Sequence, residues 1–331
     1  MTPRERFIKI LDFNMNLDRI PRVEFSPWWD KTLNRWKKEG LPNMNQLQSL
    51  KYFGFDPILL IYANAAEVGL PHAEYNGGPI IGFVRTYDDI RKYLYTDALI
   101  DAVALQAHEH KERHDNGDII LRIRLDGFFW FPRVLLGIEP HFYAFYDEPE
   151  LIHRINNDLA DFHIKIVDAV CSVLKPDMAG FAEDMSYNHG PMLSKDLYNK
   201  FLLPYYRKVI PHIKKQGIKV FVDSDGNIAE MIPWLLEAGI EGAYPLERQA
   251  GMDLNKIRAM YPRFLLISGY DKMVMSLGEK SMRAEFERLL PVMKSGGYIP
   301  SVDHQTPPEV SLNNYRTYIK LLEEYTRKAV L

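Results

Sequence analysis

The hydrophobic positions of this chain alternate between short apolar runs and longer amphipathic segments. Apolar runs at 56–63, 178–183 and 219–223 have the length and composition of strands covered on both faces. The segments 148–174 and 308–328 are expected to be long helices. Because strand and helix alternate regularly from residue 178 onward, the pattern predicts a parallel sheet with crossover helices.

The same pattern gives the remaining elements. Further strands are expected at 22–25, 118–125, 242–245, 264–268 and 297–302. Further helices are expected at 33–38, 194–216, 228–238, 253–261 and 277–294. Together these make about eight strands, a number that favours a closed barrel over an open sheet.

The first residues predict a helix ahead of the first strand. Thr2 is the expected N-cap, Pro3 occupies the first helical position and Glu5 completes a capping box. Residues 76–84, NGGPIIGFV, have the pattern of a hairpin or flap, and no linker rich in Gly, Ser or Pro divides the chain. We therefore predict an α/β protein, a single-domain (β/α)8 TIM barrel over residues 1–331 with an N-terminal helical extension and a hairpin insertion.

Composition adds constraints on location and partners. Hydrophobic residues make up 47% of the chain, and the net charge of −3 comes from well-mixed charges with no basic face for nucleic acid. No apolar run approaches the ~18 residues of a membrane span, and the N-terminus lacks the apolar core of a signal peptide. We therefore expect a cytoplasmic protein that binds neither nucleic acid nor membrane.

Two sequence features exclude common kinds of site. The one cysteine, Cys171, rules out an internal disulfide framework and a multi-cysteine metal site. It falls on an apolar helical stripe, which favours a place in the core over a role as nucleophile. Neither GxGxxG nor GxxxxGK[ST] occurs, which weakens the case for dinucleotide binding.

The candidate chemistry centres on the segment KVFVDSDGN, residues 219–227. An apolar run is followed by two carboxylates two residues apart, Asp223 and Asp225. In α/β proteins, active sites lie at the carboxyl ends of the strands. Two neighbouring carboxylates are costly to bury unless they share a cation or a proton. Taken alone, either aspartate could equally cap the helix that follows.

Polar residues follow most of the other predicted strands as well. They are Glu24, Asn64, Asp126, Glu183, Asp184, Asp223, Asp225, Glu247, Tyr270, Asp271, Asp303 and His304. A barrel would bring these residues around one mouth. Acidic groups and a histidine can hold a divalent cation there. Without a cation, the carboxylates would raise one another's pKa values, which suits acid–base chemistry.

Other side chains near the same strand ends are candidates for substrate contact. Tryptophan and tyrosine side chains could wall an apolar substrate, although such aromatic clusters are as often part of the core. His72 and His189 lie in loops beside the expected mouth, whereas His153, His163 and His212 lie on helices and are expected on the surface or in packing. The predicted substrate contacts are Trp28, Trp29, Asn64, Trp130, Tyr187, His189, Glu247 and Tyr270.

Several segments carry a family pattern that covers nearly the whole chain. They are TPRERFIKIL…DRIP, YFGFDPI, GPMLSKDLYNKFLLPYYRKVI, VDSDGNI…PWLLEAGIEGAYPLE, ISGYDK and GGYIPSVDH…PPEVSLNNY. With these segments the chain resembles the uroporphyrinogen decarboxylase superfamily, which includes that decarboxylase and corrinoid-dependent methyltransferases. The resemblance implies a (β/α)8 barrel with its active site at the carboxyl ends of the strands.

The chain departs from the decarboxylase branch of this family. That branch has an arginine-rich motif on its first barrel strand, which grips the acidic tetrapyrrole, whereas the corresponding region here reads EFSPWWDK. Its catalytic aspartate would fall near Ala63, beside Asn64. Decarboxylation of a uroporphyrinogen is therefore not expected, because a polycarboxylate ligand needs dense positive charge.

The chain also departs from the methyltransferase branch, which carries zinc on a His-x-Cys pair and a later cysteine. The corresponding positions here are occupied by Asp223 and Asp225, and by the region of Asp303 and His304. The thiolates are replaced by oxygen and nitrogen groups. Such a harder ligand set is better suited to polarising an oxygen atom.

These comparisons lead to one main hypothesis and two alternatives. The main hypothesis is a metal-assisted methyltransferase that moves a methyl group from a small methoxy or methylamine substrate to the corrinoid of a partner protein. Its divalent metal, expected to be zinc, would be held by four residues that are also the predicted catalytic set: Glu183, Asp223, Asp225 and His304. The alternatives are a metal-free, decarboxylase-like lyase acting on a smaller acid, and a barrel that binds a ligand without catalysis. The methyl donor and the oligomeric state are left open.

Overall fold

The centre of the protein is a curled sheet of parallel strands. The structure, a computed structural model, describes residues 1–26, 28–66 and 87–331. Within these residues the sheet has seven strands in the order β1-β2-β3-β6-β7-β8-β9. Its strands are β1 (Ile58–Ala63), β2 (Ile120–Asp126), β3 (Met178–Ala182), β6 (Lys219–Asp223), β7 (Gly242–Tyr244), β8 (Leu265–Ile267) and β9 (Tyr298–Ile299). A separate antiparallel hairpin follows β3 and consists of β4 (Ser186–Tyr187) and β5 (Gly190–Pro191).

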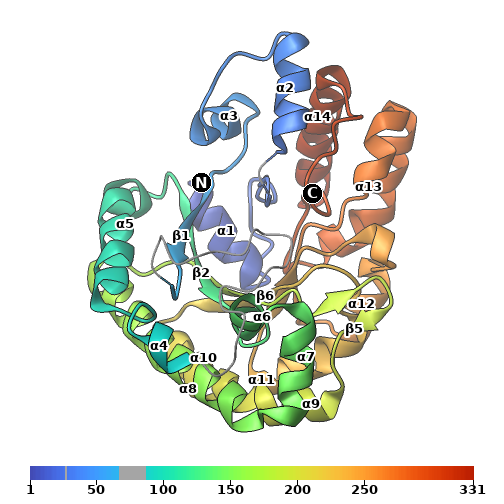
Figure 1. The fold of residues 1–331 in the computed structure, drawn as a ribbon. Coiled ribbons are helices and arrows are strands. Elements are labelled where there is room, and N and C mark those ends of the chain that lie inside the picture. Colours follow the sequence, from blue (N-terminus) through green and yellow to red (C-terminus); the bar gives the residue numbers. More distant parts are fainter. Residues whose placement is uncertain (27, 67–86) are drawn as a thin grey trace.

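Helices surround this sheet, as Figure 1 shows. The α-helices are α1 (Pro3–Leu11), α2 (Asp30–Lys38), α3 (Gln46–Tyr52), α4 (Tyr87–Arg91), α5 (Asp97–Asp115), α6 (Trp130–Leu136), α7 (Ile138–Asp147), α8 (Pro149–Val173), α9 (Lys195–Phe201), α10 (Leu203–Lys215), α11 (Ile232–Ala238), α12 (Leu254–Met260), α13 (Glu279–Lys294) and α14 (Leu312–Lys328). Short 3-10 turns are η2 (Ala229–Met231), η3 (Arg248–Ala250) and η4 (Lys272–Leu277). The predicted alternation of strand and helix from residue 178 onward is confirmed.

The two ends of the predicted helix 194–216 belong to different helices. The predicted helix is interrupted at Leu202, which lies between α9 and α10 and two residues before Pro204. Proline in the first turn of a helix costs no hydrogen bond, whereas in a continuous helix it would remove one. The predicted capping box of the first helix is confirmed, because the Thr2 Oγ1 accepts from the Glu5 N–H and the Glu5 carboxylate accepts from the Thr2 N–H.

The register of the sheet sets one edge at which polar residues meet. Asp126 of β2 pairs with Ala182 of β3, which pairs with Asp223 of β6, which in turn pairs with Tyr244 of β7. These residues end their strands at the same level. The loops that follow them therefore leave the sheet side by side, as expected for parallel strands.

The prediction of a strand at 22–25, and with it a closed eight-stranded barrel, is wrong for the described residues. The segment lies between the two ends of the sheet: the Asp56 N–H, before β1, donates to the Arg22 carbonyl at 2.7 Å. On the other side, the Phe25 N–H donates to the Ser301 Oγ, after β9, at 3.1 Å. No strand ladder forms on either side. Prolines at positions 21 and 27 flank the segment in sequence and offer no N–H for one.

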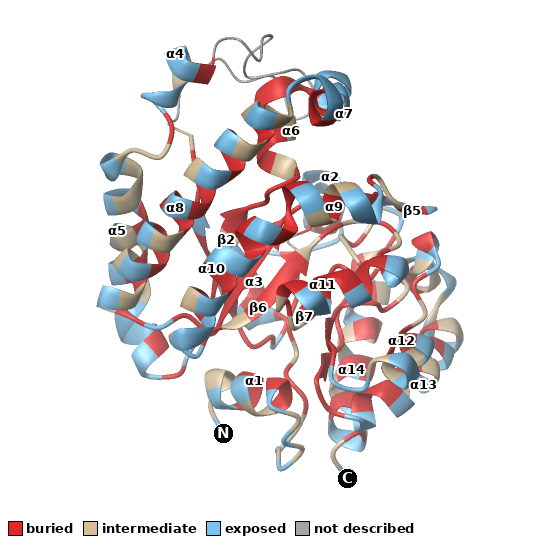
Figure 2. Ribbon diagram, turned by 90° about the horizontal axis from the view of Figure 1, so that it is seen from below, coloured by how far each residue is buried: buried red, intermediate tan, exposed pale blue. Residues whose placement is uncertain are grey.

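The core lies between the sheet and the inner faces of the helices. Figure 2 shows the strands buried and the outward faces of α8, α10 and α11 exposed. Strand residues such as Ile123, Phe181 and Val222 have no exposed surface. In the part of the chain that the structure describes, no helix has the length and apolar character needed to cross a membrane. The predicted hairpin at 76–84 and His72 lie outside the described residues.

Candidate active site at the carboxyl edge of the sheet

Asp223 and Asp225 stand at the carboxyl edge of the sheet, as predicted. Asp223 ends β6, and its backbone carbonyl accepts from the N–H groups of Glu183 and Asp184 at 2.8 and 3.3 Å. Ser224, between the two aspartates, is fully buried. Because side chains alternate along an extended chain, both aspartates point to the side opposite Ser224. The alternation of side chains along residues 223–225 therefore places both carboxylates on the same side of the chain.

The centre of the site is a carboxyl–imidazole contact between the loops that follow β6 and β9. Asp225 Oδ1 lies 3.5 Å from His304 Nε2. Burial, with Asp184 and Glu247 nearby, raises the pKa of Asp225 to about 7. Burial also lowers the pKa of His304 below its ordinary value of 6.5. Asp225 therefore exchanges its proton near neutrality, with the His304 imidazole beside it as a proton acceptor or donor.

Beside this pair, a lysine in the loop after β8 joins the loops after β7 and β9. Lys272 Nζ lies 3.6 Å from Glu247 Oε1 and 3.7 Å from Asp303 Oδ1. Glu247 also accepts from the Gly226 N–H at 2.9 Å, and Asp303 accepts from the backbone N–H groups of Arg248 and Lys272 at 3.0 and 3.3 Å. Burial raises the pKa of Asp303 to about 7. Asp303 thus braces two loops, while Glu247 faces the site, as predicted.

Two arginines of β2 supply positive charge beneath Asp223. Arg122 is buried, with its guanidinium 4.8 Å from the ring centre of Tyr244. Arg124 Nη1 lies 3.1 Å from Asp126 Oδ1. Burial raises the pKa of Asp223 to about 7, against the opposing charges of Arg122 and Arg124. Asp223 is therefore a second carboxyl that exchanges its proton near neutral pH.

Glu183 does not lie with these groups, and its predicted role as a metal ligand is corrected. The Glu183 carboxylate accepts from the backbone N–H groups of residues 128–130 at 2.7, 2.7 and 3.2 Å and also from the Tyr206 hydroxyl. It has no exposed surface, and burial raises its pKa to about 7. A Cβ at Gly127 would stand 2.2 Å from Glu183 Oε2, so this approach requires glycine. Glu183 fixes the start of α6, and its neighbour Asp184 faces the site instead.

The four predicted metal ligands therefore do not meet at one point. Across residues 1–26, 28–66 and 87–331, no group of three or more His, Cys, Asp or Glu side chains has a geometry that could hold a metal ion. Glu183 already accepts four hydrogen bonds, whereas Asp225 and His304 form a pair. The predicted zinc set does not fit this arrangement, and no catalytic step is derived through it.

Two of the predicted substrate contacts belong to the core instead. Trp28 is 6% exposed, and its Nε1–H donates to the Tyr315 hydroxyl at 2.9 Å. Tyr270 has no exposed surface; its hydroxyl donates to the Met282 carbonyl at 3.1 Å, and its ring centre lies 4.6 Å from that of Phe286. Both aromatic rings are therefore packed between the sheet and helices rather than presented to a ligand.

The remaining predicted contacts lie at or near the surface. Tyr187 is 48% exposed, and its ring packs edge-on against His189 with 5.7 Å between ring centres. Trp29 and Asn64 are exposed. Trp130 is half-buried, with the guanidinium of Arg133 4.3 Å from its ring centre. Of this set, Tyr187, His189 and Glu247 line one cavity with Asp225.

That cavity has a volume of about 400 Å³ and opens above the Asp225 loop. Its wall is the β4–β5 hairpin, which rests on Gly226: the Asn227 N–H donates to the Tyr187 carbonyl at 2.9 Å. Gly226 has φ +85°, and a Cβ there would stand 2.6 Å from the Tyr187 backbone. The glycine that follows the two aspartates thus lets the cavity wall approach them.

Lys272 and Arg124 are site residues that the sequence interpretation missed. The sequence contains a pattern that could have indicated each of them. Arg122, Arg124 and Asp126 recur with a period of two, which places them on one face of β2. Lys272 directly follows Tyr270 and Asp271, which had been placed at a strand end. A search for cations as well as acids at the strand ends would have found both residues.

The fold and this site define a parallel α/β protein with an acid–base centre at the carboxyl edge of its sheet. The sequence family described as uroporphyrinogen decarboxylase (URO-D) matches residues 46–325. The chain belongs to this family, whose superfamily consists of enzymes. The resemblance inferred from sequence segments is therefore confirmed at the level of the superfamily.

Other comparisons add little to this assignment. No curated protein matches the chain significantly. Among solved structures, D-psicose 3-epimerase from Clostridium cellulolyticum H10 is 12% identical, with a TM-score of 0.37 over 86% of this chain and 89% of that one. Endo-glycoceramidase II from Rhodococcus sp. is 11% identical, with a TM-score of 0.43 over 90% and 78%. These likenesses are too low to bear on the site or its chemistry.

Proposed function

We propose that this protein is a methyltransferase that moves a methyl group from a small neutral or cationic donor to the corrinoid of a separate partner protein. The proposal rests on one observation: Asp225 and His304 form a pair beside a cavity, surrounded by further carboxyl groups that titrate near neutrality. Such a pair can deliver a proton to a leaving group. That is the task that the sequence interpretation had given to a metal.

The proton is needed because the leaving group gains charge as the methyl group departs. When the carbon–oxygen bond of a methyl ether breaks, its electron pair stays on oxygen, and an alkoxide is a poor leaving group in water. A carboxyl or imidazolium within hydrogen-bond reach protonates that oxygen as the bond breaks, and the acid is left deprotonated. A neutral methylamine takes up its proton in the same way, whereas a methylammonium already carries that proton and leaves as the neutral amine.

The charge of the site favours donors that carry no negative charge. Five carboxyl groups gather there: Asp184, Asp223, Asp225, Glu247 and Asp303. The nearby cations are already engaged, since Lys272 lies between Glu247 and Asp303, and Arg124 contacts Asp126. Adding a carboxylate to this cluster would be opposed by like charge. A methyl ether or an N-methyl ammonium group meets no such opposition.

A direct test uses free cob(I)alamin as the methyl acceptor in place of the partner protein. Purified protein would be mixed with methoxylated aromatic compounds and with methylamines, and the conversion of cob(I)alamin to methylcobalamin followed by absorbance. We expect turnover with at least one uncharged or cationic donor and about a 100-fold loss in Asp225→Asn. Absence of methylcobalamin with every donor, for a folded protein and with the partner protein supplied, would refute the proposal.

A lyase is the second candidate, and one observation favours it. Arg124, which is paired with Asp126 and lies near Asp223, could exchange Asp126 for a single substrate carboxylate. Loss of CO2 leaves a carbanion, which a neighbouring carboxyl would protonate. Release of CO2 from a monocarboxylic acid, with loss of that activity in Arg124→Gln and no methylcobalamin formed, would select the lyase. Ligand binding without either reaction would select the non-catalytic barrel.

A further inference from the structure

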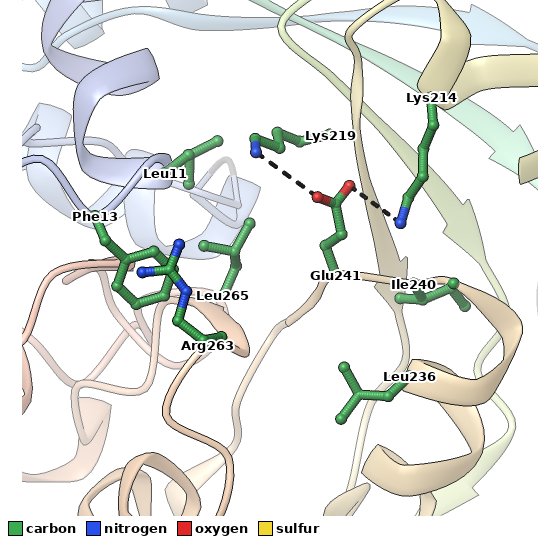
Figure 3. A pocket seen from close by; sticks show the side chains of 10 residues that line it. Leu11, Phe13, Lys214, Lys219, Leu236, Ile240, Glu241, Arg263 and Leu265 are labelled. Carbon is green, nitrogen blue, oxygen red and sulfur yellow. Dashed lines mark ion pairs between the residues drawn. The ribbon is translucent and has the colours of Figure 1, made fainter. Parts of the chain in front are cut away.

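A second pocket lies at the opposite, amino-terminal end of the strands (Figure 3). It has a volume of about 290 Å³ and opens between the end of α1 and the starts of β6, β7 and β8. Leu11, Phe13, Leu236 and Leu265 provide apolar walls, and Lys214, Lys219, Glu241 and Arg263 provide charges. None of these residues takes part in the proposed reaction.

The charged side chains give this pocket an excess of positive charge. Three cations face one anion, Glu241, on a chain whose net charge is −3. Glu241 lies 3.7 Å from Lys219 Nζ and 3.9 Å from Lys214 Nζ, so a single carboxylate is shared by two ammonium groups, as Figure 3 shows. Lys219 has a second acidic partner, Asp12, at 3.1 Å. The remaining cation, Arg263, forms an ion pair with neither Glu241 nor Asp12.

Arg263 and its neighbour Arg258 form a like-charged pair without a carboxylate. The Arg263 side chain is exposed; its guanidinium lies 3.9 Å from the ring centre of Phe13 and, among the described residues, has no hydrogen bond or ion pair. Arg258 lies 5.2 Å from the same ring centre. It donates to four backbone carbonyls, while its buried Nε has no partner. Burial and the charge of Arg263 lower the pKa of Arg258 to about 10.

An anion bound between these side chains would relieve the repulsion between Arg258 and Arg263. The two guanidinium groups on one ring repel each other, and because Arg258 is partly buried, water screens its repulsion with the exposed Arg263 less than in bulk solvent. A bound oxyanion would reverse the sign of the interaction. Arginine is suited to this role, because its planar N–H groups match the oxygens of a phosphate or carboxylate.

We propose that the amino-end pocket, formed by Phe13, Lys214, Lys219, Glu241 and Arg263, binds a phosphate-type oxyanion through Arg263 and the two lysines. The apolar walls accommodate a hydrophobic group attached to that oxyanion, so a phosphomonoester such as phenyl phosphate binds more tightly than inorganic phosphate. Because the pocket and the Asp225–His304 pair lie at opposite ends of the sheet, this ligand and the methyl donor bind at the same time.

The test is calorimetric titration of the whole protein with inorganic phosphate and, separately, with phenyl phosphate at low ionic strength. We expect saturable binding of both ligands. Arg263→Gln and Lys219→Met are each expected to weaken binding about tenfold, which is the loss of roughly one charge-assisted contact. Arg113→Gln removes an exposed guanidinium on α5 with no partner among the described residues, and it should leave binding unchanged.

Two further measurements keep the outcomes distinct. Thermal unfolding of each variant shows whether it is folded. If Arg263→Gln does not fold, the binding measurement on Lys219→Met is used instead. Asp225→Asn should bind phenyl phosphate like the wild type, because it lies at the other end of the sheet. The proposal is overturned if the wild type binds neither ligand, or if Arg113→Gln weakens binding as much as Arg263→Gln does. Tighter binding of inorganic phosphate than of phenyl phosphate would overturn the assignment of the apolar walls.

Discussion

Asp225 and His304 belong to loops at distant points of the chain, yet Asp225 Oδ1 lies 3.5 Å from His304 Nε2. The parallel sheet makes this contact possible, because the loops after β6 and β9 leave at the same edge. Burial, together with the neighbouring carboxyl groups, then raises the pKa of Asp225 to about 7. Sheet topology thus converts two unremarkable loop residues into an acid–base pair.

The raised pKa of Asp223 predicts a pH-dependent gain in stability on its replacement. Burial raises this pKa from 3.8 to about 7, so the folded protein binds the proton more tightly than the unfolded chain does. This stabilisation is complete below about pH 4 and is lost as the pH rises through 7. Relative to the wild type, Asp223→Asn should therefore gain on the order of 1 kcal/mol between pH 4 and pH 8.

Thermal unfolding at several pH values measures this gain. Asp101→Asn, which changes an exposed aspartate of α5, serves as the matched control and should show no such trend. A difference in Tm between Asp223→Asn and the wild type that stays constant from pH 4 to pH 8 would show that Asp223 has an ordinary pKa.

Gly226 is predicted to be essential for the wall of the cavity. A Cβ at this position would stand 2.6 Å from the Tyr187 backbone, and φ is +85°. Gly226→Ala should therefore destabilise the protein by more than about 1 kcal/mol and lower activity. Gly190, in the β4–β5 hairpin that rests on Gly226, also has positive φ (+121°), but a Cβ there meets nothing within 4 Å. Equal losses of Tm and activity in Gly190→Ala would show that strain alone, and not the close approach, is responsible.

Glu183 is predicted to be a structural residue. Glu183→Gln would turn an amide NH2 toward backbone N–H groups that now donate to a carboxylate, with an expected loss of roughly 2–3 kcal/mol. Tyr206→Phe removes one donor of the same network and should cost less, about 1 kcal/mol. Chemical denaturation of both variants provides the comparison. A stable Glu183→Gln with altered donor specificity would instead return Glu183 to the substrate site.

Much of the fold follows from the sequence because buried parallel strands and amphipathic helices have distinct periods. The strands β1, β2, β3 and β6 were predicted within two residues of their bounds. The segment 22–25 was wrongly predicted to be a strand. Its apolar pattern is that of a strand, but the pattern does not reveal whether a neighbouring strand is available for backbone hydrogen bonding. Strand pairing depends on the neighbouring strands, so it cannot be predicted from the local sequence pattern alone.

The site could be predicted in part, because the predicted strand ends show where the polar residues gather. Strand ends located Asp223, Asp225, Glu247 and His304, which the structure does bring together. Glu183 failed because, at a strand end, one residue faces the core and the next faces the site. An error of one residue therefore exchanges Glu183 for Asp184. Trp28 and Tyr270 failed because an aromatic side chain at a strand end fills the core as readily as it lines a cavity.

The pH dependence of methyl transfer to cob(I)alamin tests the central claim most directly, since the claim is that the Asp225–His304 pair supplies a proton. The wild-type rate should fall as the pH rises through about 7, where Asp225 loses its proton. Asp225→Asn and His304→Gln should each lose about 100-fold in rate, and the decline near pH 7 should disappear or shift. Full activity with an unchanged pH profile in both folded variants would contradict the account.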